Sequence, residues 1–271
     1  MSAEAKAEVR SFWDEAACGE RLLLASTDRA GFSAQAVERY RLEPYIIAFA
    51  GFDRWRGKRV LEIGVGLGAD HQRFVEAGAN TTGIDLTPRA IGMTQQRLEA
   101  FGLSSDLQVA DAEALPFPTA AFDLVYSWGV IHHSPDTPAV VAEILRVLKP
   151  GGEARIMIYS KWSLVGMMLW GRYALLRGRP FTSLADIYSR HLESPGTKAY
   201  SVDQTKRLFA RFSDVRIRTT LSHGDLLSSG AGQRHSGHIL DIARRIWPRW
   251  FVRRFLKGRG LFMMIEARKP T

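Results

Sequence analysis

The sequence has very little cysteine and no long apolar run. Cys18 is the single cysteine among 271 residues, so no intramolecular disulfide can form and a reducing, cytoplasmic setting is expected. Residues Met1 to Arg10 are polar and mixed in charge, without the apolar segment of a signal peptide. No later run approaches the roughly 18 to 20 apolar residues that a membrane-spanning helix needs. We therefore expect a cytoplasmic protein without a membrane span.

Several motifs that define common enzyme classes are also missing. The chain has no Cys-x-x-Cys and no His-Glu-x-x-His, so we expect no bound metal. It lacks the Gly-Lys-Ser/Thr end of a phosphate-binding loop. None of the seven tyrosines is followed four positions later by lysine, which argues against the Tyr-x-x-x-Lys pair of short-chain dehydrogenases.

Acidic residues are fewer than basic ones, and the formal net charge is +9. Much of the excess lies in residues 244–259, where seven basic residues and no acidic one are interleaved with two tryptophans and two phenylalanines. We consider two interpretations: an amphipathic helix whose aromatic side chains pack on the core, or a helix that makes peripheral contact with a membrane or lipid. We do not expect nucleic acid as a partner, because no recognisable binding motif accompanies the charge.

Short apolar strands alternate with helical segments along most of the chain. This alternation predicts an α/β fold with a parallel sheet covered by helices on both faces, built as one core domain with additions. The expected strands are 58–63, 80–85, 107–110, 122–127, 153–159, 215–220 and 261–267. The expected helices are 3–18, 33–51, 67–77, 88–101, 138–148, 164–176 and 203–212, and residues 221–236 read as a loop.

The most informative stretch is Val60 to Asp70, V-L-E-I-G-V-G-L-G-A-D, in which a buried strand runs into a glycine-rich turn. Alternating glycines remove Cβ atoms and let a ligand approach the backbone at the start of the following helix. Gly64, Gly66 and Ala69 also fit the dinucleotide-binding pattern. The turn alone therefore predicts a small-molecule site and leaves the cofactor open.

Acidic residues end the strands that follow this turn. Asp85 closes its strand 21 positions after Gly64, a distance that suits an acceptor for ribose hydroxyls. Asp111 ends the next strand and starts the run D-A-E-A-L-P-F. Further along are F-D-L-V-Y-S at 122–127, H-H-S-P-D at 132–136 and L-R-V-L-K-P-G-G-E at 145–153. This ordered series resembles the class I S-adenosylmethionine-dependent methyltransferases, in their broad small-molecule group, over about residues 58–160.

The resemblance implies a Rossmann-like, seven-stranded, mostly parallel sheet whose last strand is antiparallel. It implies S-adenosyl-L-methionine as cofactor, S-adenosyl-L-homocysteine as product and no metal. Ser127 and Trp128 would present backbone to the amino-acid end of the cofactor and open the floor of the substrate pocket. The residues implied for the methionine part are Gly64, Val65, Gly66 and Gly68.

Four further positions carry implied contacts with the same cofactor. Glu62 would help to hold the amino group through the loop, and Asp85 would take the ribose hydroxyls. Leu86 would pack on adenine, while Asp111 with Ala112 would read the adenine edge. The site would then lie at the carboxyl ends of the strands, where open α/β sheets bind ligands.

His132 and His133 follow the strand over 122–127, where the methyl acceptor is expected. Methyl transfer from a sulfonium requires in-line alignment, with a base where the nucleophile carries a proton. Either histidine can be that base, and the resemblance favours His133; alternatively, they brace the turn at 134–136. His71 lies either beside the cofactor or on a helix surface.

Segments outside the shared core are expected to choose the acceptor. We predict an N-terminal helical cap over residues 1–52 and a methyltransferase domain over 53–271 with a lid insertion at about 161–202. Aromatic residues in both additions suit a flat or hydrophobic acceptor and would exclude water. The polar run at 191–198 either adds donors at the pocket mouth or is an ordinary loop. The substrate-lining residues predicted on this basis are Trp13, Tyr40, Tyr45, Trp162 and Tyr173.

Three functions remain open at this point. The preferred one is a methyltransferase that acts by in-line displacement on an O, N or C nucleophile of a small aromatic or hydrophobic metabolite. The second is a membrane-associated methyltransferase of a lipid-like quinone or sterol, docked through residues 244–259. The third is a non-catalytic, cofactor-binding homologue.

Overall fold

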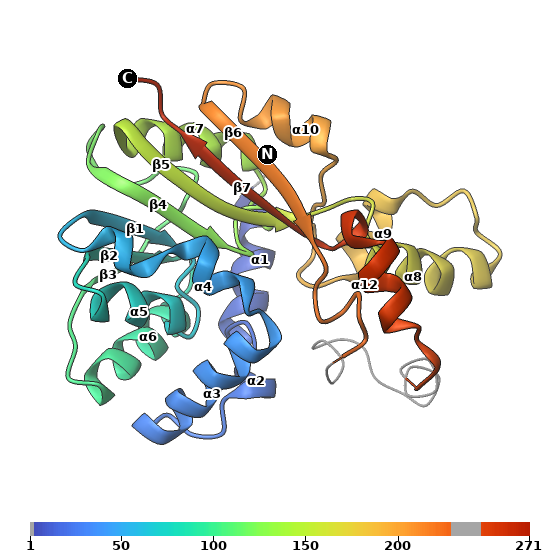
Figure 1. Ribbon diagram of the computed structural model, residues 1–271, viewed down its shortest axis with the longest axis horizontal. Helices are drawn as coiled ribbons and strands as arrows, with labels where there is room; N and C mark the ends of the chain where they lie inside the picture. Colours follow the sequence, from blue (N-terminus) through green and yellow to red (C-terminus); the bar gives the residue numbers. More distant parts are fainter. Residues whose placement is uncertain (1–2, 229–244) are drawn as a thin grey trace.

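One seven-stranded sheet organises the part of the chain that the computed structural model describes, residues 3–228 and 245–271 (Figure 1). The strand order is β3-β2-β1-β4-β5-β7-β6. Strands β1 to β5 pair in parallel, and β7 runs antiparallel to both β5 and β6. This confirms the predicted mostly parallel sheet. The strands are β1 Arg59–Ile63, β2 Asn80–Asp85, β3 Asp106–Val109, β4 Phe122–Trp128, β5 Leu148–Tyr159, β6 Ser213–Thr220 and β7 Phe262–Arg268.

Helices connect and cover these strands. Local chemistry fixes several of their starts: the Thr87 side chain accepts a hydrogen bond from Ala90 N, and Asp136 accepts one from Ala139 N. The helices of the first half are α1 Ala3–Glu15, α2 Glu20–Leu23, α3 Arg29–Leu42, α4 Tyr45–Ala50, α5 Ala69–Glu76 and α6 Pro88–Ala100. Those of the second half are α7 Thr137–Val147, α8 Leu164–Tyr173, α9 Leu184–His191, α10 Val202–Leu208 and α12 Arg249–Phe255. Short 3-10 turns are η1 Phe52–Trp55, η2 Leu175–Arg177 and η3 Lys257–Arg259.

The core lies on both faces of the sheet, because side chains alternate along each central strand. Leu61 and Val125 point into a cluster that includes residues of α7 and α10. Val60 and Leu124 point into the opposite cluster, which includes residues of α4 and α5. All four are fully buried, and each such side chain contributes about 1.5–3 kcal/mol of hydrophobic free energy. The strand ends that carry the loops are therefore held rigidly.

The N-terminal helix expected over 33–51 is two helices, α3 and α4. Asp28 starts α3 earlier than expected, since its carboxylate accepts a hydrogen bond from Gly31 N at 2.7 Å. Pro44 interrupts the helical ladder because it has no N–H, and Glu43 before it takes φ −128° and ψ 60°. The break turns the chain so that Glu43 faces the sheet and reaches Trp128.

A second lobe, built from α8, η2, α9 and α12, stands at one end of the sheet (Figure 1). The helix expected over 244–259 is shorter: α12 covers Arg249–Phe255, after Pro248, and η3 follows it. Arg244 and part of the expected loop, 229–236, lie outside the described residues. The interpretation that its aromatic residues pack on the core is wrong for Trp250 and Phe255, which are 74% and 57% exposed, and for the exposed Phe251. Trp247 is partly buried and donates a hydrogen bond to Asp225 O.

Among the helices of the described ranges, none is both long and apolar enough to cross a membrane. Helix α8 illustrates the point: it is apolar, but it has 10 residues.

Candidate active site

A cavity of about 460 Å³ opens at the carboxyl ends of β1 and β4, the point where the strand order reverses. Open α/β sheets bind ligands at such switch points. Helix α1 and helix α8 both contribute to its wall, so the N-terminal helices and the segment after β5 meet at one space. The residues predicted for the cofactor that line this cavity are Glu62, Gly64, Val65, Gly66, Gly68, Asp85, Leu86, Asp111, Ala112 and Trp128.

The glycine turn after β1 has a backbone that only glycine tolerates well. Gly64 has φ +83°, and a Cβ there would lie 2.2 Å from a methyl of Val130. Gly66 has φ +54°, and a Cβ there would meet nothing within 4 Å. The first glycine thus lets the loop after β4 pack against the turn, and the second leaves the cavity open at the backbone.

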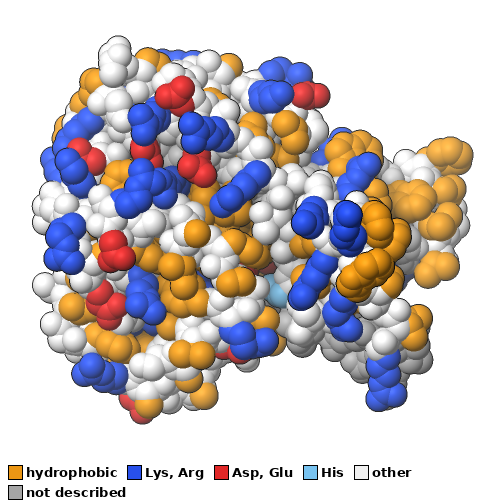
Figure 2. Space-filling model, viewed as in Figure 1, with side chains coloured by type: hydrophobic (Ala, Val, Ile, Leu, Met, Phe, Trp, Pro, Cys, Tyr) orange, Lys and Arg blue, Asp and Glu red, His pale blue; other side chains and the backbone are white. Residues whose placement is uncertain are grey.

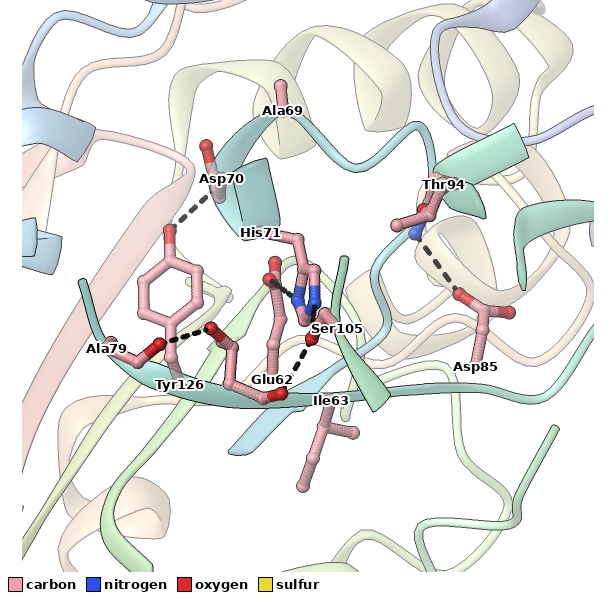
Figure 3. Close-up of polar contacts among 12 residues, drawn as sticks. Glu62, Ile63, Ala69, Asp70, His71, Ala79, Asp85, Thr94, Ser105 and Tyr126 are labelled. Atoms are coloured by element: carbon pink, nitrogen blue, oxygen red, sulfur yellow. Dashed lines mark hydrogen bonds and ion pairs between the residues drawn. The ribbon is translucent and has the colours of Figure 1, made fainter. Parts of the chain in front are cut away.

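Glu62 and His71 form a buried pair beneath the turn (Figure 3). Ser105 Oγ donates its proton to Thr81 O at 2.6 Å, so it accepts from His71 Nε2 at 2.9 Å. His71 Nδ1 therefore faces Glu62 Oε2 at 3.0 Å across a single shared proton. Burial raises the pKa of Glu62 and lowers that of His71 to about 4, which places this proton on the carboxyl. The prediction of His71 as a helix-surface residue is wrong, because its side chain is fully buried.

Asp70, at the start of α5, anchors the turn to the N-terminal cap. Its carboxylate accepts hydrogen bonds from Arg39 Nε at 3.1 Å and Nη2 at 2.6 Å, from Tyr40 OH at 3.0 Å and from Tyr126 OH at 2.9 Å. Burial opposes ionisation, but Arg39 and the two hydroxyls outweigh it and hold the pKa of Asp70 below its ordinary value. The network ties α3, α5 and β4 together, and Figure 3 shows the Tyr126 contact.

The two acids at the ends of β2 and β3 differ in their partners. Asp85 accepts from Thr87 N and Thr87 Oγ1 at 3.0 Å each and from Gly66 N at 3.3 Å, so it also supports the glycine turn. Asp111 accepts from Glu113 N at 2.9 Å and pairs with Lys6. Lys6 also lies 2.6 Å from Glu113 Oε2. Helix α1 therefore closes over this end of the cavity through one lysine.

Ser127 and Trp128 at the end of β4 differ in their position relative to the cavity. Ser127 is fully buried, donates from its Oγ to Ile63 O at 2.9 Å, and is not among the cavity-lining residues. Its side chain therefore ties β4 to β1, and the contact between its backbone and the cofactor stays a prediction. Trp128 lines the cavity, where its Nε1 donates to Glu43 Oε2 at 3.1 Å. Burial raises the pKa of Glu43 to about 7, although Arg39 opposes the shift.

The two predicted histidines differ in whether they line the cavity. His133 lines the cavity, and its Nδ1 lies 2.8 Å from Ser194 Oγ and 3.1 Å from Thr197 Oγ1. His132 is fully buried and is not among the cavity-lining residues, so its predicted catalytic role is corrected to a packing role against Tyr159, at 4.0 Å between ring centroids. Neither ring nitrogen of His132 has a hydrogen-bond partner among the described residues. Burial lowers its pKa well below the ordinary value and keeps it neutral.

Glu193, in the polar run at 191–198, completes the group around His133. Its Oε2 lies 3.3 Å from His133 Nε2 and accepts a hydrogen bond from Tyr159 OH at 2.7 Å. Burial would raise the pKa of Glu193, but His133 and the Tyr159 hydroxyl outweigh burial and lower it. Ligand atoms of Glu193, His132 and His133 all lie within 4.8 Å of one another, a donor set whose residue types a divalent transition metal accepts.

The acceptor side of the cavity is apolar, but its aromatic lining is not the one predicted. Trp13 lines the cavity and packs edge-on against His133, at 5.2 Å between ring centroids. The lid contributes aliphatic side chains instead of aromatic ones. The apolar residues on this side include Val165, Met168, Leu169, Leu192, Leu227, Leu261 and Phe262.

Four predicted substrate residues are not among the cavity-lining residues and are corrected here. Tyr40 is buried with its hydroxyl on Asp70, and Tyr45 stacks on Trp128 behind the wall. Trp162 is about half exposed, and Tyr173 stacks on His191 at 4.0 Å. These aromatic rings support the wall or the surface of the lobe.

Among the charged cavity residues that sequence reasoning missed, three come from the N-terminal segment: Lys6, Arg39 and Glu43. Each comes from the N-terminal helices, whose sequence carries no motif. The sequence signal for Arg39 and Glu43 is weak: an i,i+4 pair that ends a helix before Pro44, with Arg39 Nη1 and Glu43 Oε2 3.7 Å apart.

Comparison with known proteins shows what this domain is similar to. Residues 61–156 match the family model described as "Methyltransferase domain". The central part of the chain is therefore similar to methyltransferase domains. The match spans the strands β1 to β4 and most of β5, and with them the glycine turn and both histidines.

Curated relatives align over the same core. The phthiotriol/phenolphthiotriol dimycocerosates methyltransferase of Mycobacterium leprae is 40% identical over 98 residues, covering 35% of this chain and 36% of that protein. The ubiquinone biosynthesis O-methyltransferase of Aromatoleum aromaticum is 38% identical over 98 residues, covering 36% and 42%. The chain thus spans less than half the length of the curated relatives it matches.

A solved structure extends the likeness in fold. The Haemonchus contortus phosphoethanolamine N-methyltransferase 2, in complex with phosphomonomethylethanolamine and S-adenosylhomocysteine, superposes with a TM-score of 0.59. It is 18% identical, and the match covers 97% of this chain and 60% of that one. The agreement shows that the fold, including the segments outside the matched core, is one that methyltransferases use.

Proposed function

We propose that this chain moves the methyl group of S-adenosylmethionine to a nucleophile of a small hydrophobic acceptor. The bound cofactor would supply an activated methyl group on its sulfonium. One observation carries the proposal: a single cavity joins the glycine turn and the acidic strand ends to an apolar wall and to the pair of His133 and Glu193. Such continuity allows the reacting atoms to be held in line.

The residues on the strand ends fit the cofactor in charge and shape. Gly66 leaves room at the backbone, and Asp85 has acceptor capacity for ribose hydroxyls. Asp111 lines the cavity and would contact the adenine. Glu62 suits an ammonium group, because its proton can pass to His71 Nδ1 at 3.0 Å and leave a carboxylate. The buried pair keeps the same total charge in both states, so the shift creates no new net charge in the core.

His133 is the candidate base for an acceptor that carries a proton. The residue lines the cavity, and its Nε2 lies 3.3 Å from Glu193 Oε2. Nδ1 can donate to Thr197 Oγ1, because the Thr197 hydroxyl donates its own proton to Ser194 O at 2.6 Å. Nε2 would then hold the lone pair, and Glu193 would stabilise the imidazolium that forms.

The acceptor is inferred to be hydrophobic from the wall that faces His133. Aliphatic side chains of the segment after β5, together with Leu261 just before β7, dominate that wall. Two relatives are named for ubiquinone biosynthesis and for phthiotriol dimycocerosates, which are hydrophobic products. An aliphatic wall fits a prenylated or acyl-bearing acceptor as well as a flat ring.

A methyl-transfer assay tests the proposal. The purified chain would receive methyl-labelled S-adenosylmethionine and a panel of hydrophobic phenols, quinols and amines, with S-adenosylhomocysteine release and label transfer as readouts. His133→Gln should lower kcat by roughly 10²–10⁴-fold for a hydroxyl acceptor. Its affinity for S-adenosylhomocysteine should stay unchanged, and the matched variant His132→Phe should keep its rate. A wild-type rate in His133→Gln would show that His133 is not the base. Cofactor binding by the wild type without any turnover would favour the non-catalytic alternative.

A further inference from the structure

The second lobe exposes more large apolar side chains than packing within the chain explains. In the outer turn at 175–181, Leu176 is 83% exposed and Phe181 100%. In and before α12, Ile246 is 76% exposed and Trp250 74%. Such groups are costly in water when they gather in one region, and they commonly mark an interaction surface. Leu175, Phe251 and Phe255 are exposed as well. We call the exposed apolar and basic side chains of residues 175–181 and 245–259 the docking face.

The same two segments are uniformly basic. Residues 175–181 and 245–259 together contain eight Lys and Arg and no Asp or Glu. Figure 2 shows Lys and Arg side chains beside hydrophobic ones over α12, and further hydrophobic side chains at the outer end of the lobe. The exposed basic residues of the docking face are Arg177, Arg179, Arg245, Arg253, Arg254, Lys257 and Arg259.

The docking face is tied to the lid side of the cavity through Asp225. This buried carboxylate accepts hydrogen bonds from Val165 N at 3.1 Å and from Leu261 N at 2.8 Å. Trp247, just before α12, donates from its Nε1 to Asp225 O at 3.0 Å. Val165 and Leu261 both line the cavity. The segment that carries α12 and the wall that would hold the acceptor are therefore one connected unit.

We propose that this face docks on an anionic membrane surface and that the acceptor enters the cavity from the lipid phase. The inference rests on the proposed function and deepens it, because it identifies the acceptor as a lipid-soluble one. A short helix with exposed Trp and Phe among Arg and Lys matches the chemistry of an interfacial helix: aromatic rings enter the headgroup region, and cations meet anionic lipids. Each Lys or Arg near such a surface increases partitioning about fivefold.

Other occupants fit the same face less well. A symmetric contact with a second copy would place this patch against itself, so basic side chains would oppose basic side chains without an acid between them. Nucleic acid would satisfy the charge but would leave the exposed Leu176 and Phe181 side chains in water. Only a surface that is anionic at its rim and apolar beneath satisfies both halves of the pattern.

Vesicle flotation tests the proposal with the full chain. Vesicles of phosphatidylcholine with about one third phosphatidylglycerol should carry the protein at low salt, and pure phosphatidylcholine should carry much less. Arg253→Glu/Arg254→Glu should weaken binding at least about 25-fold. The matched control Lys206→Glu/Arg207→Glu changes the same charge on exposed residues of α10 and should bind like the wild type. Trp250→Ala/Phe251→Ala should reduce the binding that persists at high salt.

The outcomes separate this proposal from the proposed function. S-adenosylhomocysteine affinity, measured by calorimetry on each variant, should not change, because none of these side chains lines the cavity. No flotation of the wild type at low salt would overturn the docking proposal and leave the proposed function standing. So would equal binding of the α10 and α12 variants, competition by RNA of the vesicle-bound fraction, or a wild-type dimer that the α12 substitutions dissociate. Loss of cofactor binding in the wild type would instead overturn the proposed function.

Discussion

The buried His132 allows one prediction whose magnitude follows directly from the structure. Its ring is inaccessible to solvent, both ring nitrogens lack partners in the described part of the chain, and its pKa lies well below the ordinary value. In the unfolded chain the pKa is about 6.5, so below that pH the unfolded state binds a proton that the native state does not. Stability must therefore fall as the pH falls from about 6.5 towards the native pKa.

The magnitude is about 1.4 kcal/mol for each pH unit per proton. At pH 6.5 half of the unfolded chains already carry the proton, so between pH 6.5 and pH 4.5 His132 should remove about 2.3 kcal/mol of the free energy of unfolding. His132→Phe should lack this loss and keep the ring contact with Tyr159. Other titrating groups, including His71, are common to both proteins and cancel in the difference.

Urea denaturation followed by circular dichroism at several pH values measures this effect. His132→Phe should gain stability relative to the wild type as the pH falls from 6.5 to 4.5. His132→Asn, which also cannot titrate in this range but fills less space, should show the same change in slope at a lower stability throughout. Parallel pH profiles of the wild type and His132→Phe would refute the assignment of a neutral, unpaired ring.

Three further predictions concern the glycine turn and its supports. Gly64→Ala should lower stability by about 2–4 kcal/mol, because a Cβ would meet Val130 at 2.2 Å, whereas Gly57→Ala, also at positive φ but with nothing within 4 Å, should cost only about 1 kcal/mol; comparable thermal unfolding midpoints of the two would contradict this. Asp70→Asn should cost about 3–5 kcal/mol by leaving Arg39 without its buried partner, while exposed Asp53→Asn should be neutral; a midpoint shift below about 2 °C in Asp70→Asn would argue against the network. His71→Gln should weaken S-adenosylhomocysteine binding about tenfold, since Glu62 loses the nitrogen that takes its proton; unchanged affinity by calorimetry would exclude the shared-proton role.

Motifs near the strand ends could be read from the sequence because short-range geometry fixes their place. Asp85 ends β2, and Gly66 and Asp111 lie shortly after β1 and β3; parallel strands bring these carboxyl ends to one edge. The seven-stranded, mostly parallel sheet and its antiparallel last strand followed from the resemblance and were confirmed, whereas the strand order comes from the structure.

Residues that reach the site from other segments were less predictable. Lys6 meets Asp111 across 105 positions, and Arg39 meets Asp70 across 31, so no local pattern indicates either contact. The aromatic lid prediction erred for a related reason: composition shows which rings a segment contains, but not which side of a helix faces the cavity. Tyr40 and Tyr173 both lie in helices that border the site and point elsewhere.

The two histidines show where prediction from the sequence stops. His132 and His133 are adjacent and identical in type, and only tertiary packing directs one ring into the cavity and the other into the core. Glu193, which completes the group, comes from the insertion after β5 at a separation that no spacing rule covers.

Calorimetric titration of S-adenosylhomocysteine into the wild type, Asp85→Asn and Asp123→Asn tests the central claim most directly. The account predicts one binding site in the wild type and affinity lower by about 10- to 150-fold in Asp85→Asn, which loses charge-assisted hydrogen bonds. Asp123→Asn, at the opposite end of β4, should bind like the wild type. No binding heat in the wild type, or equal affinity of the two variants, would contradict a cofactor site at the ends of β1 and β2.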